Sequence, residues 1–187
     1  MKITLLLASF PATLAAQLAY TPPAALAVKA KDPNNNCVLP EDYHVKEFTA
    51  ITNDTGHSLV SYKLTFLNTL TNSSTSCQYG SDSKPIPSPN GGGLPRYSCE
   101  SKDVNFIWQE EPKKLTMIQK VCPDAQGQAE YEAAGSVIIS LSCNLNVCQT
   151  NDTDIKGTFT SLNPTQNIRA MRHKRGVAWA SHLANQD

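Results

Sequence analysis

Two histidines of the central part of the chain could exchange a proton near neutral pH. His44 alternates with Tyr43 and Val45 in a strand-like pattern that places it on the polar side, and His57 follows Gly56 in a turn. Neither belongs to a nucleophile elbow or to a zinc-binding helix motif. We interpret both as surface histidines and predict no catalytic residue.

Two groups of glutamates are the other candidates for acid–base chemistry. Glu110 and Glu111 are adjacent, so on a strand their carboxylates point to opposite faces. Glu130 and Glu132 can share a face, but glycosidase chemistry needs carboxyl groups held across a sugar-binding cleft, and a solvated rim explains them better. The chain is therefore predicted not to be an enzyme. A small extracellular hydrolase acting on wall polymers or RNA is the alternative.

Six cysteines are the next residues that could bind a metal or form covalent bonds. They lack the short paired spacings, with histidines nearby, that a zinc site uses, so we expect neither a metal nor a cofactor. An even number in a small exported protein indicates a disulfide framework, because oxidising compartments preserve such bonds. They are Cys37, Cys77, Cys99, Cys122, Cys143 and Cys148.

The beginning of the chain predicts export. In residues 1–18, Lys2 precedes an apolar run from Ile3 to Phe10, and small residues follow, as in a secretory signal peptide. The run is too short to span a bilayer. We expect a secreted, extracellular protein that does not bind a membrane. Residues 19–36 have two adjacent prolines, scattered alanines and a polar end, which predict a flexible lead-in or a pro-segment.

Charge divides the remaining chain in two. Residues 37–168 hold nine Lys and Arg against fourteen Asp and Glu, and such an acidic body argues against a nucleic-acid partner. Residues 164–187 form a basic tail that we predict to be disordered. Within it, Lys174 and Arg175 followed by Gly176 resemble a dibasic processing site. Contact with a partner or a membrane surface is the other interpretation of this cluster.

Three Asn-x-Ser/Thr sequons lie where turns are expected, and such acceptors must be exposed. Their asparagines are Asn53, Asn72 and Asn151. We therefore predict a glycoprotein whose glycans mask the ends of the domain.

Residues of alternating character predict the strands that carry these sites. Alternation is strong in His57–Leu70, Val104–Trp108 and Val137–Cys143, and weaker in Tyr43–Ile51, Leu115–Val121 and Ile155–Leu162. The residues expected to share one core are Tyr62, Leu64, Phe66, Phe106, Trp108, Ile139 and Leu141.

Turn-forming and helix-forming residues separate the strands. Lys84–Pro95 is rich in Pro and Gly and is expected to be an exposed loop, because nothing else of a phosphate-binding motif accompanies its glycines. Gln126–Ala134 has helix-forming composition, which a helical turn or a polar hairpin explains equally well. Short strands at regular spacing favour a sandwich or a barrel, and residues 37–163 are predicted to form one all-β domain.

Three stretches of this domain together resemble a family. They are Cys37–Phe48, with a Cys-Pro opening and an aromatic strand; His57–Leu70 continuing to Cys77; and Arg96–Cys99, which closes the loop begun at Cys77. They are similar to the fungal secreted family of proteins like the major allergen of Alternaria. The resemblance covers about residues 37–162. Cys122 and the short gap between the last two cysteines depart from the family pattern, and Lys84–Pro95 stands as an insertion.

The resemblance implies a compact antiparallel β-barrel or sandwich of two sheets, stabilised by disulfides and without a catalytic centre. Family members act as allergens and as effectors or elicitors that contact plant-defence proteins. For this chain it implies a secreted, non-enzymatic fungal effector, elicitor or allergen-like protein that binds a host extracellular protein or a small apolar ligand. A structural cell-wall protein is a third possibility.

The cysteine pairing follows in part from the same resemblance. Cys77 and Cys99 would close the loop across the Pro/Gly segment, and Cys143 with Cys148 could clip a tight turn. Cys37 and Cys122 then remain, and we expect an internal bond between them and a monomer. The competing arrangement keeps Cys37 for a disulfide dimer and leaves Cys122 free. Six cysteines permit fifteen connectivities, so the sequence favours only the first pair strongly.

Overall fold

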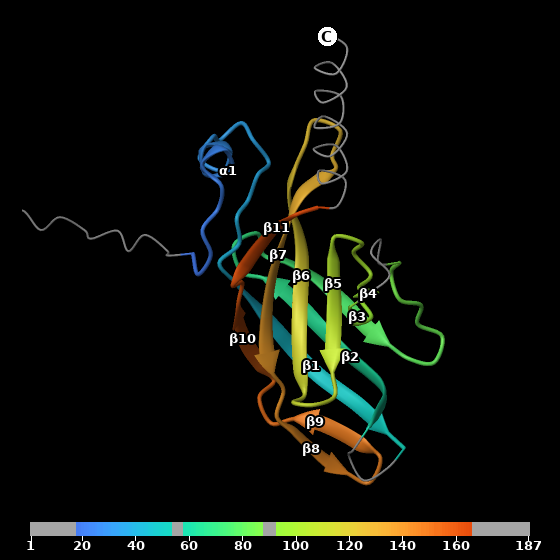
Figure 1. Ribbon diagram of the computed structural model, residues 1–187. Helices are drawn as coiled ribbons and strands as arrows, with labels where there is room; N and C mark the ends of the chain where they lie inside the picture. Colours follow the sequence, from blue (N-terminus) through green and yellow to red (C-terminus); the bar gives the residue numbers. More distant parts are fainter. Residues whose placement is uncertain (1–17, 54–57, 88–92, 166–187) are drawn as a thin grey trace, which may run out of the picture.

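The computed structural model describes residues 18–53, 58–87 and 93–165, which form two antiparallel sheets facing one another (Figure 1). The predicted all-β class with disulfides is confirmed. The predicted signal peptide up to residue 17, and the tail from residue 166 with Lys174 and Arg175, lie outside the described residues. Within those ranges, no helix combines the length and apolar character needed to cross a membrane.

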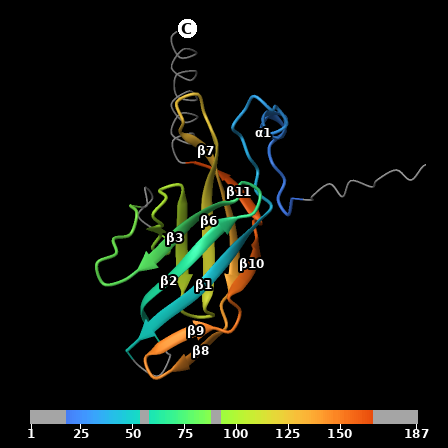
Figure 2. The same ribbon diagram turned by 180° about the vertical axis from the view of Figure 1, so that it is seen from behind.

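The first sheet has the strand order β3-β2-β1-β9-β8, and β10 pairs with another part of β1 (Figure 2). The predicted strands near Tyr43–Ile51 and His57–Leu70 are found here as β1 and β2. The sheet consists of β1 (Asp42–Thr52), β2 (Leu59–Asn68), β3 (Ser73–Tyr79), β8 (Leu141–Asn144), β9 (Val147–Thr150) and β10 (Asp154–Thr158).

The second sheet has the order β11-β7-β6-β5-β4. Its strands are β4 (Tyr97–Ser98), β5 (Val104–Gln109), β6 (Lys114–Pro123), β7 (Ala129–Ile138) and β11 (Ser161–Pro164). The segment Gln126–Ala134 forms the polar turn between β6 and β7 and the first part of β7, so the hairpin alternative is the observed one. Gly127 has a positive φ of 77°, which suits this turn.

A bulge divides β1 between two partners. The register shifts between Lys46 and Thr49, and Glu47 between them has a positive φ of 54°. Before the bulge β1 pairs with β10, and after it β1 pairs with β9. The Glu47 N–H donates to the carbonyl oxygen of Thr153 at 3.0 Å, so the extra residue stays hydrogen-bonded. The bulge thereby lets one strand hold the β8–β9 hairpin at its far end.

Two glycines allow close packing along one side of the sandwich, Gly135 between the two sheets and Gly157 within the first sheet. A Cβ on Gly135 of β7 would lie 2.1 Å from the carbonyl oxygen of Thr158 in β10. A Cβ on Gly157 of β10 would lie 2.3 Å from Cζ of Tyr43. β10 nevertheless belongs to the first sheet and β7 to the second. The fold is therefore a sandwich whose sheets do not close into a barrel, which corrects the barrel alternative of the prediction.

The predicted core residues meet between the two sheets. Five of them are buried, whereas Trp108 and Leu141 are partly buried and pack against the others. The buried ones are Tyr62, Leu64, Phe66, Phe106 and Ile139. The segments with strong alternation thus point the expected face inward.

Two predicted strands are in fact pairs of strands that belong to different sheets. β7 ends at Ile138 and β8 begins at Leu141, so the segment expected as one strand crosses between the sheets at Ile139, which is buried. The segment from Ile155 to Leu162 crosses in the same way at the buried Phe159. A core residue at the crossing preserves the alternation, and the sequence pattern therefore does not reveal the break.

The segment 19–36, expected as a flexible lead-in, has defined structure and packs on the sandwich. It contains the helix α1 (Ala24–Lys29), and Tyr20 and Leu26 are buried in the core cluster. We call residues 18–40 the N-terminal strap. Tyr20 and Leu26 are too far apart to show a helical or strand period, so this packing could not be predicted from the sequence pattern.

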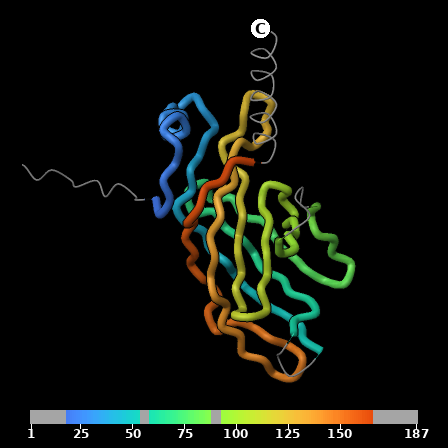
Figure 3. Tube along the Cα trace, viewed as in Figure 1, coloured from blue at the N-terminus to red at the C-terminus, as the bar shows by residue number. Residues whose placement is uncertain are grey.

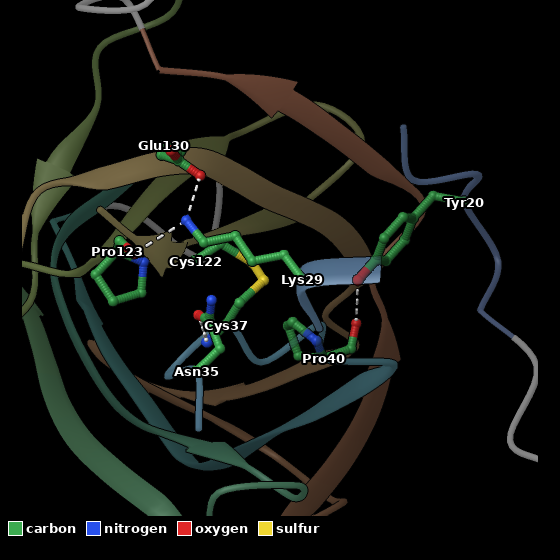
Figure 4. The surroundings of a disulfide bond; sticks show 8 residues. All are labelled: Tyr20, Lys29, Asn35, Cys37, Pro40, Cys122, Pro123 and Glu130. Carbon is green, nitrogen blue, oxygen red and sulfur yellow. Dashed lines mark hydrogen bonds and ion pairs between the residues drawn. A yellow bond between two sulfur atoms is a disulfide. The ribbon is translucent and has the colours of Figure 1, made fainter. Parts of the chain in front are cut away.

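Polar contacts hold the strap at the end of the β6–β7 hairpin (Figure 4). The Lys29 ammonium donates to the Glu130 carboxylate at 2.8 Å and to the Pro123 carbonyl oxygen at 3.3 Å. The Tyr20 hydroxyl donates to the Pro40 carbonyl oxygen at 2.8 Å, and burial raises the pKa of Tyr20 to about 12, so this donor stays protonated at physiological pH. The strap lies at the end of the molecule opposite the β8–β9 hairpin (Figure 3).

Candidate binding surface

The cysteines are joined in the pairs Cys37–Cys122, Cys77–Cys99 and Cys143–Cys148. These are the pairs that the sequence analysis preferred, and the described residues include no free cysteine. Both partners of the first bond are buried, so Cys37 lies inside the molecule. The three bonds fix the strap, the edge of the first sheet and the β8–β9 hairpin.

The acid–base candidates of the sequence are not gathered into a catalytic group. His44 lies on the outer face of β1 and hydrogen-bonds through Nδ1 to the carboxylate of Asp154 in β10, while His57 lies outside the described residues. Glu110 accepts a hydrogen bond from Trp108 Nε1 at 2.8 Å, whereas the neighbouring Glu111 is exposed. Each described candidate is thus held by a structural contact or open to solvent.

Glu130 and Glu132 do face the same way, as their spacing allowed, and each is engaged by a cation. Lys29 binds Glu130, and the Arg96 guanidinium donates to both carboxylate oxygens of Glu132 at 2.9 Å. These pairs fasten the strap and the loop before β4 to β7. Within the described part of the chain, no group of three or more His, Cys, Asp or Glu side chains is placed to hold a metal ion.

A charged row runs along the outer face of β1 and β10. Lys156 and Thr69 hydrogen-bond to the carboxylate of Asp42, and they hold its pKa below the ordinary value. The hydrogen bond from His44 likewise lowers the pKa of Asp154. The row balances its own charges, so we regard it as a support for the pairing of the two strands.

The three sequon asparagines are exposed, at positions that connect strands. Asn53 directly follows β1, Asn72 precedes β3 with a positive φ of 52°, and Asn151 lies between β9 and β10. These places match the predicted turns, and glycosylation itself stays a prediction.

A hollow on the outer face of the first sheet is the site that the sequence analysis missed. Its volume is about 310 Å³, at the lower end of the range for ligand pockets. Three strand pairings bring its walls together. Ile51 of β1 pairs with both Val147 of β9 and Ser61 of β2, and β2 pairs in turn with β3. The lining residues are Thr49, Ala50, Ile51, Ser61, Tyr62, Lys63, Gln78, Tyr79 and Val147.

The rim of the hollow is apolar and exposed. Ile51 and Val147 keep 50% and 57% of their surface accessible, although apolar residues of this size are usually buried. Beneath the sheet, the ring of Tyr62 stacks on those of Tyr79 and Phe48, with centroids 5.0 and 5.8 Å apart. Burial raises the pKa of Tyr62, whose phenol stays neutral. The floor of the hollow is therefore backed by packed aromatic rings.

Polar groups around the hollow are available for a partner. Lys63 is exposed, and no ion pair or side-chain hydrogen bond to another described residue engages it. Thr49 and Gln78 flank Lys63 in the pairing and are likewise free of side-chain hydrogen bonds within the described residues. An apolar rim beside unengaged polar groups is the composition expected of a recognition site.

Solved structures similar to this chain include two of Alt a 1, the major allergen of Alternaria alternata. The first has a TM-score of 0.47 and 17% sequence identity, and the match covers 66% of this chain and 88% of that chain. The second has a TM-score of 0.46 and 18% identity, and the match covers 66% and 93%. Alt a 1 is the allergen whose family the sequence motifs resemble.

No protein-family model matches this chain, and no curated protein matches it. A structural likeness at such low identity concerns the fold, and one fold can serve many functions. What the protein binds must therefore be argued from its own surface.

Proposed function

We propose that the protein is a secreted, non-enzymatic binding protein of the allergen-like kind, acting as a fungal effector or elicitor. Its target would be a host extracellular protein, such as a plant-defence protein, and its contact surface the outer face of the first sheet. Export is inferred from the signal-like residues 1–18, of which 1–17 lie outside the described residues. Because Cys37 is engaged in an internal bond, we propose that it acts as a monomer.

The observation that carries this proposal is the hollow with its exposed apolar rim. Isolated exposed apolar residues are common, but Ile51 and Val147 are direct neighbours in the sheet and border one depression. The disulfide-fixed frame beneath them holds the contact residues before a partner arrives, which lowers the ordering cost of binding. A small apolar ligand would find room in the same place, and the experiment below distinguishes it.

The hydrolase alternative has less support from the same geometry. Glu130 and Glu132, the carboxylate pair that the sequence analysis considered, are engaged by Lys29 and Arg96. A general acid or base must be able to reach the substrate, and each of these carboxylates is instead engaged by a cation of the same chain. No particular feature of the described surface supports a structural role in the cell wall.

The test is retention of a plant extracellular protein by the immobilised full-length, oxidised protein. We expect one or more host proteins to be retained by the unaltered chain and lost with Val147→Asp, which places a charge on the rim. Leu70→Asp is the matched control, because Leu70 is 62% exposed and lies in the turn between β2 and β3. The pairing of Asn68 with Tyr43 places this turn at the opposite end of β1 from Ile51.

Retention that is equal for all three proteins would contradict the proposed surface. If only small molecules are retained, as detected by mass spectrometry of the eluate, the ligand alternative replaces the protein partner. Hydrolysis of wall polysaccharide or RNA by the purified protein would overturn the non-enzymatic part.

A further inference from the structure

The tip of the β8–β9 hairpin carries a leucine in a conformation that leucine disfavours. Asn144 pairs with Val147, so Leu145 and Asn146 form a two-residue turn. Leu145 has a positive φ of 56° and Asn146 does not, and this pattern normally places glycine first. Leu145 is also 87% exposed. The protein thus keeps a large apolar side chain at a strained, solvent-facing position, and the other described residues leave most of its surface uncovered.

The hairpin that presents Leu145 is held rigidly. The bond between Cys143 and Cys148 ties its two strands together one pair below the turn, and Cys148 is fully buried. Thr52 at the end of β1 donates its N–H to the Asn146 carbonyl oxygen at 2.9 Å. Leu145 is consequently fixed in position relative to Val147, which belongs to the rim of the hollow.

The hairpin itself contains no charged residue. No Lys, Arg, His, Asp or Glu occurs from Ala133 to Asn151, a stretch that includes the whole hairpin. Depletion of charged residues distinguishes the centre of a protein interface from the rest of a surface. The nearest unengaged charge of the described hollow is Lys63, across the depression from Val147.

The outermost strand of the first sheet, β8, also leaves its edge open within the described residues. Leu141–Asn144 carries neither Lys nor Pro, although its short length itself limits pairing with other chains. β9 and β1 separate β8 from Lys63 of β2, so the contacts proposed next are made on the outer face of the sheet and not at this edge.

We infer that the β8–β9 hairpin is the anchor of the binding surface, with Leu145 as the residue on which affinity depends. The inference rests on the proposed function and names the chemistry of the partner. The partner is an extended, largely apolar protein segment that carries one carboxylate. Its apolar side chains contact Leu145, Val147 and Ile51, and its carboxylate reaches Lys63.

The key variant is Leu145→Gly, because it separates binding from folding. Glycine adopts a positive φ without strain, so this variant should unfold at a higher temperature than the unaltered protein. If Leu145 is the anchor, the same variant should bind about tenfold more weakly or worse, as truncation of a central anchor does. If Leu145 had a purely structural role, the unfolding temperature and the affinity for the partner would change in the same direction in Leu145→Gly.

The probe is a displayed library of random peptides, selected on the full-length, oxidised protein. We expect the enriched peptides to be apolar with an acidic residue and to lose affinity for Leu145→Gly. Lys63→Met should weaken the same peptides and remove most of the dependence of their affinity on salt, since the lost contact is a solvent-exposed ion pair. Leu70→Gly, an exposed leucine at the other end of β1, should change nothing.

The inference is overturned if no peptide is enriched, if enriched peptides are basic, or if they bind Leu145→Gly as tightly as the unaltered protein. Its failure differs from failure of the proposed function. A host protein that Val147→Asp releases but Leu145→Gly retains would leave the binding function standing and remove the hairpin from it.

Discussion

Replacing Gly157 by alanine tests how closely the ring of Tyr43 packs on β10, the partner strand of β1 in the first sheet. The new Cβ would lie 2.3 Å from Cζ, 2.5 Å from Cε2 and 2.6 Å from the hydroxyl oxygen of Tyr43. The ring has little freedom to move away, because Tyr43 is fully buried between Phe66 and Phe159, with ring centroids at 5.8 and 4.9 Å. The methyl group can therefore be accommodated only by moving the core or β10.

Overpacking of this kind costs about 1–3 kcal/mol. We expect about 3 kcal/mol, because the shortest distance is roughly 1 Å inside van der Waals contact and the obstacle is a rigid ring. In a domain of this size each kcal/mol lowers the midpoint of thermal unfolding by about 2–4 °C, so the expected decrease is about 6–12 °C.

The measurement is thermal unfolding followed by circular dichroism with the disulfides intact. Gly80→Ala is the matched control, since its Cβ would have no heavy atom within 4 Å and its φ is not positive. Tyr43→Phe is a second control. It removes a buried hydroxyl that has no hydrogen-bond partner among the described residues, so alone it should raise the free energy of unfolding by about 1 kcal/mol. Because Cζ remains, it should not rescue Gly157→Ala. Equal midpoints for Gly157→Ala and Gly80→Ala would refute the packing argument.

The disulfides and the charged row give the remaining predictions. Removing Cys37 and Cys122 together as serines should cost about 4.5 kcal/mol by chain entropy, because the bond spans 85 residues, whereas removing Cys143 and Cys148, which span 5, should cost about 2 kcal/mol. Urea unfolding of the two double variants measures the order, and the reverse order would contradict it. The pKa of Asp42 is below its ordinary value of 3.8, so its contribution is present at neutral pH and is lost as the pH falls from about 4 through the folded-state pKa. Asp42→Asn should flatten that acid limb of the free energy of unfolding, and an unchanged limb would disprove the linkage.

The strands were predictable where one face of a sheet meets the core and the other meets water. Tyr62, Leu64 and Phe66 alternate with polar residues for that reason, and the alternation identifies β2 directly. β3 was not predicted as a strand of its own, because Ser73–Tyr79 is rich in serine and lies at the edge of the sheet, where few side chains are buried. Burial, more than strand structure, is what the sequence pattern records.

The binding surface depends on contacts that a linear pattern does not contain. Ile51 and Val147 are far apart in the sequence and become neighbours only through the register of β1 with β9. That register in turn depends on the bulge at Glu47. No residue type at this position indicates a bulge, so the sequence did not predict it. The charge-free stretch around the hairpin was visible in the sequence, but its meaning required knowing that Leu145 is exposed. The preferred pairing of the cysteines came in part from the family resemblance, and the sequence favoured only Cys77 with Cys99 strongly.

The bond that fastens the strap has a consequence for the order of events during synthesis. Cys37 emerges from the ribosome 85 residues ahead of Cys122, and at about 5–20 residues per second its thiol waits roughly 4–17 s for its partner. Cys77 and Cys99 emerge within that interval, and either can capture the waiting thiol in an oxidising compartment. Correction then proceeds by thiol–disulfide exchange, in which a thiolate attacks the wrong bond. The N-terminal strap is therefore the part of the molecule whose maturation depends most on isomerase activity, although its residues are the first of the domain to be made.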